Sequence, residues 1–237
     1  MNASSWRRWW PSLTGSRRRP SEREGLGLGL ASEFVAQGWA VTATVRSAAQ
    51  QAPLQALPGV RVEQLEMTDP ASLEQLAQRL SGQQFDVIFV NAGVAGPSHH
   101  STAQASAEEM GQLFLTNAVA PLRVAEALVP LMGQGSKIAN ITSRMGSIGD
   151  NDSGGSYGYR MSKTALNAAG KSLAVDLKKH GIAVALLHPG WVNTEMVNFN
   201  GLIEPEEAAA GLQARMDELN LENSGGFWHS NGDQLPW

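Results

Sequence analysis

The sequence contains no cysteine, so neither a disulfide nor a thiol nucleophile is possible. An excess of charge is also lacking: the formal net charge is −4, which gives no electrostatic basis for binding nucleic acid. No apolar run approaches the roughly 18 residues that a membrane-spanning helix needs, and no membrane span is expected. The length of 237 residues suits one domain with a full hydrophobic core. We expect a cytoplasmic protein whose partner is a small molecule.

A metal site is not expected either. His99 and His100 are adjacent, but neighbours in sequence do not form a metal site by themselves. No carboxylate or further histidine lies at a useful helical spacing from them. We interpret the pair as part of a solvated loop, with lining of a substrate pocket as the alternative.

Tyrosine is scarce, and one of the two tyrosines, Tyr159, lies four residues before Lys163 in a stretch typical of a helix start. Residues four apart share a helix face, which places the ammonium beside the phenol. A nearby cation favours the phenolate, so we expect the tyrosine pKa to fall below its usual value of about 10. Such a tyrosine can give a proton to a carbonyl, or take one from an alcohol, near neutral pH. An accidental surface pair is the alternative interpretation.

Strand and helix patterns alternate along the chain after Gly25. Strands are expected at 40–45, 60–65, 86–90, 137–142, 182–187 and 226–228, and helices at 31–37, 71–80, 106–131, 157–179 and 205–219. This alternation predicts an α/β fold with a single doubly wound parallel sheet of the Rossmann type. The uniformly apolar strands agree with burial on both faces. With no internal repeat, residues 25–237 are expected to form one domain.

Further motifs lie where the predicted strands end, which is where open α/β sheets place their sites, and one more residue lies in a predicted helix. They are Asn91, Ala92 and Gly93 after strand 86–90, Asn117 within the helical region 106–131, Ser143 after strand 137–142, and Pro189, Gly190 and Thr194 after strand 182–187. Together with Tyr159 and Lys163, this ordered set resembles the short-chain dehydrogenase/reductase family over roughly residues 25–237. Segments 141–148 and 232–237 resemble the carbonyl-reductase branch that includes the C-factor-like and sniffer-like proteins.

The resemblance implies that four residues reduce a carbonyl, or oxidise an alcohol, with a nicotinamide that supplies the hydride chemistry. Tyr159 would be the general acid for reduction and the base for oxidation. Lys163 would lower the pKa of Tyr159 and hydrogen-bond the nicotinamide ribose. Ser143 would hydrogen-bond the substrate oxygen, with Ser147 as its rival, and Asn117 would support Lys163 through a water. A non-catalytic nucleotide-binding or signalling protein that kept the fold is the alternative.

A glycine-rich segment precedes the first predicted helix. Gly25 and Gly27 would let the backbone approach a pyrophosphate, whose negative charge the helix N-terminus favours, although a flexible linker would look similar. The resemblance makes them the second and third glycines of the family motif and pairs Thr14 and Gly15 with its first part.

The resemblance also assigns the rest of the cofactor site. It puts Asp69 near the adenine, and a helix N-cap is a compatible role for this residue. It puts the adenine ribose against Asn91, Ala92 and Gly93, and the nicotinamide against Pro189, Gly190 and Thr194.

The first 24 residues do not fit the alternating pattern. They hold six Arg and two Glu, a charge of +4, whereas the rest has 12 basic and 20 acidic residues, a charge of −8. Pro11 cannot donate in a central strand, and nine residues separate Gly15 from Gly25 where the family motif has three. We expect the first strand to be degenerate or missing, through a replaced N-terminus, a wrong start site or, less favoured, a natural insertion.

Self-association as a homodimer or homotetramer is implied by the resemblance, through the helical regions 106–131 and 157–179. Val124, Ala125 and Leu128 fall on one helical face and offer apolar surface, although the same residues could pack on the sheet. The substrate is expected to be a small carbonyl or alcohol compound. Its apolar character is indicated by the residues that could line a pocket, which are Val94, Met145, Ile148, Trp191, Met196 and Phe199, together with Arg144.

Arg46 follows the second predicted strand, and no Asp or Glu lies between Glu33 and Glu63. In dinucleotide folds an acidic residue at this place holds the ribose 2′-hydroxyl of NAD, whereas an arginine accommodates the 2′-phosphate of NADP. The pattern favours NADP(H), although a lone arginine can also be a solvated surface charge.

Replacing Arg46→Asp should therefore shift the cofactor preference from NADPH toward NADH. Loss of a charge-assisted hydrogen bond costs about 1.5–3 kcal/mol, so NADPH affinity should fall roughly ten- to a hundredfold. Titration of both proteins with each cofactor, followed by nicotinamide fluorescence, measures the shift. Tighter binding of NADH than of NADPH by the unmutated protein would refute the assignment.

Overall fold

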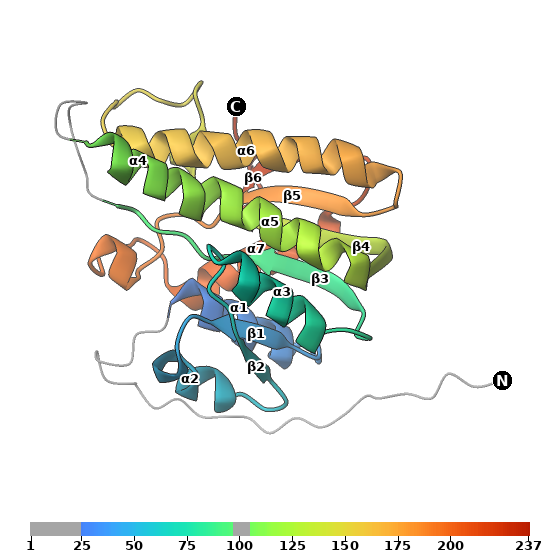
Figure 1. Cartoon of the computed structure of the whole chain (residues 1–237). Helices are drawn as coiled ribbons and strands as arrows, with labels where there is room; N and C mark the ends of the chain where they lie inside the picture. The colour runs from blue at the N-terminus through green and yellow to red at the C-terminus, as the bar shows by residue number, and fades with distance from the viewer. Residues whose placement is uncertain (1–24, 97–104) are drawn as a thin grey trace.

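The computed structural model describes residues 25–96 and 105–237. Strands and helices alternate in the predicted order (Figure 1). The strands are β1 (Thr42–Val45), β2 (Arg61–Gln64), β3 (Phe85–Val90), β4 (Met132–Ile141), β5 (Ala183–His188) and β6 (Gly226–His229). The helices are α1 (Leu26–Ala36), α2 (Ala52–Gln55), α3 (Pro70–Arg79), α4 (Ala107–Phe114), α5 (Ala120–Leu128), α6 (Tyr157–Lys178) and α7 (Pro205–Glu218). The short α2 is the one α-helix among these that the sequence patterns did not predict.

All strand pairs between the named strands are parallel, which confirms the predicted α/β class. Within the described residues, however, hydrogen bonds divide the strands into two sheets, β1–β2 and β3–β4–β5–β6, rather than the single expected sheet. The reason is that no strand of this part of the chain pairs with both β1 and β3. The segment from which the expected first strand would come, together with Thr14 and Gly15, lies outside the described residues.

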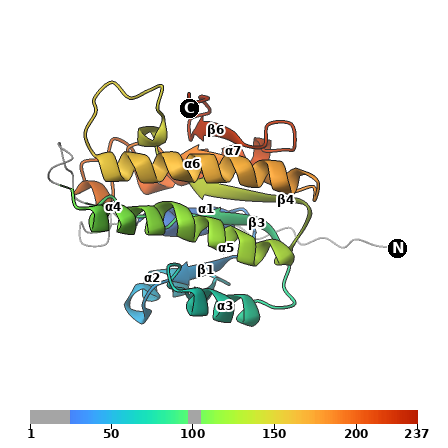
Figure 2. The same ribbon diagram turned by 45° about the horizontal axis from the view of Figure 1, so that its top comes forward.

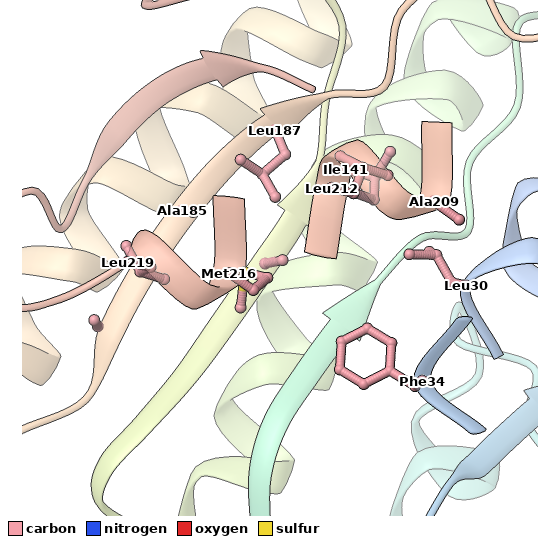
Figure 3. Close-up of a cluster of buried hydrophobic side chains, with 11 residues drawn as sticks. Leu30, Phe34, Ile141, Ala185, Leu187, Ala209, Leu212, Met216 and Leu219 are labelled. Carbon is pink, nitrogen blue, oxygen red and sulfur yellow. The ribbon is translucent and has the colours of Figure 1, made fainter. Parts of the chain in front are cut away.

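Helices cover both faces of the larger sheet (Figures 1 and 2). Because side chains alternate along a strand, Ile141 and Leu187 face α1 and α7, while Ile138 and Val184 face α5 and α6. Figure 3 shows the first of these two layers, in which Phe34 of α1 joins side chains of α7 and the strands. This layering is the doubly wound arrangement that the sequence predicted.

The predicted helical region 106–131 is one continuous segment that changes its winding in the middle. It begins at a capping box, in which the Ser106 hydroxyl accepts from the Glu109 backbone N–H at 3.1 Å. A π-helical turn then spans Leu115–Val119 between α4 and α5. Such turns widen a helix locally and are frequent at functional sites. Asn117 lies in this turn and is fully buried.

By length and composition, Ala107–Leu131 is the one helix in the described part of the chain that could cross a membrane. Length and composition alone are weak evidence for a membrane span, because core helices of soluble proteins share them. In this helix, 44% of the most apolar stretch is buried inside the structure. Ala120 and Val124 belong to the core cluster that lies over β3.

The three residues predicted to offer an apolar surface for self-association are instead buried within the chain. Val124, Ala125 and Leu128 are 7%, 0% and 8% exposed. They pack in two core clusters, against α3 and β3 on one side and β4 and α6 on the other. Of the two roles that the sequence left open for this face, self-association and packing within the chain, the structure shows the second for these residues, because helical periodicity marks an apolar face without saying what covers it. The pair His99 and His100 lies outside the described residues.

Candidate active site

The four residues predicted to be catalytic lie together beyond the carboxyl end of β4. Ser143 follows that strand, Tyr159 and Lys163 lie in the first turns of α6, and Asn117 lies in the π-helical turn. The Ser143 hydroxyl lies close enough to the Tyr159 phenol to lower its pKa, and the Lys163 ammonium lies 5.9 Å from the centre of the Tyr159 ring. Asn117 and Lys163 are almost completely buried. The predicted clustering at the strand ends is therefore present in the structure.

The state of the Tyr159 phenol differs from the prediction. Burial raises its pKa above the usual 10.0, and the hydrogen bond with Ser143 only partly opposes this rise. The expected lowering of the Tyr159 pKa was wrong, because removal of the phenolate from water is the largest influence on this group. The phenol is protonated at neutral pH, which is the form that donates a proton.

Lys163 occupies a site with little solvent. Its ammonium donates to the Ile141 main-chain carbonyl at 3.0 Å, just before Ser143. Burial lowers its pKa from the usual 10.5 to about 8. Two glycines leave room for Lys163. A Cβ on Gly93 would lie 3.3 Å from its ammonium, and a Cβ on Gly146 would lie 2.9 Å from its backbone.

Asn117 holds the loop that follows β3. Its amide oxygen accepts from the Val94 N–H at 2.9 Å, and its amide nitrogen donates to the Val94 carbonyl at 2.8 Å. The same nitrogen donates to the Ser162 hydroxyl at 3.0 Å, and that hydroxyl donates to the Tyr159 carbonyl at 2.8 Å. Sequence reasoning missed Ser162, although its place directly before Lys163 was a usable signal. A water-mediated link from Asn117 to Lys163 stays a prediction.

The structure distinguishes the two candidate serines. Ser143 accepts from the Met145 N–H at 3.2 Å and turns its hydroxyl toward Tyr159. Ser147 is 2% exposed and donates to the Trp237 carbonyl at 3.3 Å. Ser147 is thus hydrogen-bonded to the last residue of the sequence, and Ser143 is the serine that lies beside the Tyr159 phenol.

Five residues predicted to bind a cofactor lie at the start of α1 or in the loop after β3 that approaches it. Gly25 is the N-cap of this helix and has no side chain to cap it, so backbone N–H groups at the helix start have no capping side chain among the described residues. A Cβ on Gly27 would lie 3.1 Å from the Asn91 amide nitrogen, which brings the loop after β3 against this helix end. Ala92 and Gly93 continue that loop toward Asn117 and Lys163.

The remaining predicted cofactor residues lie on other strand ends. Arg46 follows β1 with an exposed side chain, and Asp69 caps α3 by accepting from the Ala71 N–H at 3.0 Å. Asp69 thus fills the N-cap role that the sequence allowed. Pro189 and Gly190 follow β5, where Gly190 has a φ of +94°, a backbone conformation that favours glycine. Thr194 begins the short helix Glu195–Val197.

Sequence reasoning also missed a pair of histidines next to Pro189 and Gly190. His188 and His229 meet edge to face, with ring centres 4.9 Å apart. Burial, and then the neighbouring His229, lowers the pKa of His188 to about 3, so this ring is neutral. The pairing joins the ends of β5 and β6 and could not be inferred from positions 41 residues apart in the sequence.

The profile of a family described as enoyl-(acyl carrier protein) reductase matches residues 21–219. The chain belongs to the short-chain dehydrogenase/reductase family. It is 42% identical over 197 residues to 1-hydroxy-2-glutathionyl-2-methyl-3-butene dehydrogenase of Rhodococcus sp. strain AD45, a match that covers 77% of this chain and 83% of the relative. It is 41% identical to C-signal of Myxococcus xanthus over 154 residues, covering 64% of this chain and 92% of that protein.

Two solved structures show the same fold. The carbonyl reductase Sniffer of D. melanogaster superposes with a TM-score of 0.83 at 30% identity, and the match covers 90% of this chain and 95% of that chain. A short-chain dehydrogenase/reductase from Burkholderia multivorans with bound NADP gives a TM-score of 0.82 at 35% identity, with the same coverage of both chains. The family and branch that the sequence resembled are confirmed.

Burial of Lys163 should make stability depend on pH. Below pH 8 the ammonium is charged in both states, and its burial disfavours folding. Between about 8 and 10.5 the folded protein loses this proton before the unfolded chain does, so the Lys163 contribution to stability rises with pH. The difference in unfolding free energy, Lys163→Met minus wild type, should therefore decrease over this range by about 3 kcal/mol.

Urea denaturation of both proteins at a series of pH values measures this difference. Lys178→Met, at an exposed lysine of the same helix, is the matched control. A difference that stays constant from pH 8 to 10.5 would show that Lys163 does not titrate in this range.

Proposed function

We propose that this protein is an NADP(H)-dependent oxidoreductase that reduces a small carbonyl compound, or oxidises the corresponding alcohol. One observation carries the proposal: the protonated Tyr159 phenol lies close to the Ser143 hydroxyl and beside the buried Lys163 ammonium. Membership in the short-chain dehydrogenase/reductase family and the names of its relatives support the same reaction class.

The described residues fit a dinucleotide cofactor. The start of α1 offers N–H groups that no side chain among residues 25–96 and 105–237 caps, which suits a pyrophosphate. Gly93 leaves the approach to Lys163 open, because a Cβ there would crowd both Asn117 and the ammonium. The exposed Arg46 after β1 suits a 2′-phosphate. Structures that superpose on this chain contain NADP or NADPH, which supports the same preference.

When bound, the nicotinamide supplies the hydride. The chain's own residues handle the proton and the charge on the substrate oxygen. We propose that Ser143 and Tyr159 hydrogen-bond this oxygen and that Tyr159 donates its proton as negative charge develops there. The Lys163 ammonium then stabilises the phenolate that remains. Asn117 keeps the loop after β3 and the start of α6 at a fixed separation through Val94 and Ser162.

The substrate is proposed to carry an apolar part. Several large apolar side chains on the loops around the strand ends are exposed, including Trp191 at 53%, Met196 at 51% and Phe199 at 42%. Exposed apolar side chains gathered on one segment mark binding surfaces more often than isolated ones do. A panel of apolar ketones and aldehydes, with a glutathionyl-bearing alcohol suggested by the Rhodococcus relative, would identify the preferred class.

A signalling protein without catalysis is the second candidate, favoured by the similarity to C-signal. It predicts nucleotide binding with no turnover of any carbonyl or alcohol. The same panel therefore separates the two functions.

Self-association of two or four copies remains part of the proposal. A groove of about 550 Å³ runs along α6, and its apolar lining includes Phe114, Tyr157, Met161, Ala165 and Ala168. Phe114 is 45% exposed and Met161 is 56% exposed, so these side chains replace the buried ones that the sequence analysis favoured. We propose that a second copy covers this groove.

Light scattering at micromolar concentration should accordingly show a dimer or tetramer. Met161→Glu should dissociate it, because a carboxylate would be buried without a partner, whereas Met161→Leu should preserve it. A monomeric wild-type protein would rule out a tight assembly.

Replacing Tyr159→Phe should lower kcat for carbonyl reduction by at least roughly a hundredfold, because the variant lacks the proton donor. NADPH affinity should stay nearly unchanged, since only one hydroxyl is removed. Steady-state kinetics and a fluorescence titration give the two quantities. Tyr157→Phe removes the same atom from the other, exposed tyrosine and should have little effect on turnover. A kcat of Tyr159→Phe close to that of the wild-type protein would refute the proposed mechanism.

A further inference from the structure

The loop between β4 and α6 contains Ser143, and hydrogen bonds fix the first half of its segment 143–150 to one part of the structure and the second half to another. The first half is held by the helix that carries Tyr159 and Lys163. The Gly146 carbonyl accepts from the Thr164 hydroxyl at 3.0 Å and from the Asn167 amide at 3.3 Å. This half is therefore part of the framework of α6.

The second half is tied to the last residue of the sequence. The Trp237 main-chain oxygen accepts from the Gly149 N–H at 2.7 Å and from the Ser147 hydroxyl at 3.3 Å. The Ser147 hydroxyl also accepts from the Asp150 N–H at 3.0 Å. One carbonyl thus closes the turn from Ser147 to Asp150 by a direct bond and through a buried hydroxyl.

This turn is linked back to the candidate catalytic serine. The Asp150 carboxylate forms an ion pair with Arg144, the residue that directly follows Ser143. The guanidinium side chain is 60% exposed and the carboxylate side chain 19%, so the pair lies at the surface of the loop. A displacement of Asp150 would act on the backbone next to the Ser143 hydroxyl.

The end of the chain is itself anchored on the core. The Trp237 ring stacks on Phe227 of β6, with ring centres 5.6 Å apart and planes at 29°. Leu235 donates its N–H to the Phe227 carbonyl at 2.9 Å and packs with Phe227 and Leu186. The carbonyl that holds the loop is therefore fixed relative to strands β5 and β6.

We propose that segment Leu235–Trp237 is a positioning element for the carbonyl site: the Trp237 main-chain oxygen fixes the turn from Ser147 to Asp150 and thereby the approach of substrate to Ser143. This inference rests on the proposed function. The segment takes no part in proton transfer, since it reaches the site only through the loop. Its loss should weaken substrate binding more than it changes kcat, and should leave the cofactor end of the site unaffected.

The test compares a variant lacking Pro236 and Trp237 with Trp237→Phe, which keeps the main-chain carbonyl and an aromatic ring. Amide hydrogen exchange of residues 147–150 should be at least roughly tenfold faster in the truncated protein, because the tie that closes the turn is gone. KM for an accepted ketone should rise roughly tenfold or more, with a smaller change in kcat and an unchanged NADPH dissociation constant. Trp237→Phe should stay close to wild type in all three measurements.

Ser147→Ala provides an independent variant that leaves Leu235–Trp237 intact, in case the truncated protein does not fold. It should also speed exchange at Asp150 and raise KM, because the link between Trp237 and Asp150 is lost. Unchanged exchange at 147–150, or faster exchange with an unchanged KM, in either folded variant would overturn the proposal. Exchange does not depend on turnover, so a wild-type protein that reduces no carbonyl would refute the proposed function separately.

Discussion

The site depends on the burial of one ammonium group. Lys163 donates to the Ile141 carbonyl at the end of β4, and this contact joins α6 to the sheet. Gly93 and Gly146 make it possible, because a side chain at either position would meet the lysine or its backbone. With the helix seated there, Tyr159 comes against Ser143. The same burial that fixes the geometry also weakens the charge of the lysine and keeps the phenol protonated.

Around this contact, polar side chains join segments that belong to different strands. Asn117 connects the loop after β3 to Ser162 of α6, and Ser147 connects the loop after β4 to Trp237. The side chains of Asn117, Ser147 and Ser162 are buried and hydrogen-bonded, so displacing any of them costs free energy. The π-helical turn at Leu115–Val119 contributes by aiming Asn117 at both partners. The network explains how loops at the edge of the sheet hold a defined arrangement of hydroxyl and ammonium groups.

Much of the fold could be predicted from the sequence, because strand and helix patterns are local. The boundaries of α6 and α7 were predicted to within one residue, and β5 to within one residue at each end. The members of the candidate site could also be named, since the ends of parallel strands meet at one edge. The pairing of His188 with His229, the role of Ser162 and the tie between Gly149 and Trp237 could not, because they join segments that only the packed sheet brings together.

The sequence by itself determined the α/β class, the family and the candidate residues Tyr159, Lys163, Ser143 and Asn117. The class and the Tyr159–Lys163 pair follow from local patterns and a short spacing, whereas the family and the roles of Ser143 and Asn117 follow from the resemblance of the ordered set of motifs. Only the tertiary structure decided the protonation of Tyr159, because burial and distance set the pKa of its phenol more strongly than the four-residue spacing to Lys163 does. It also decided that Val124, Ala125 and Leu128 are core residues, since a helical pattern shows that a face is apolar but not which neighbour covers it.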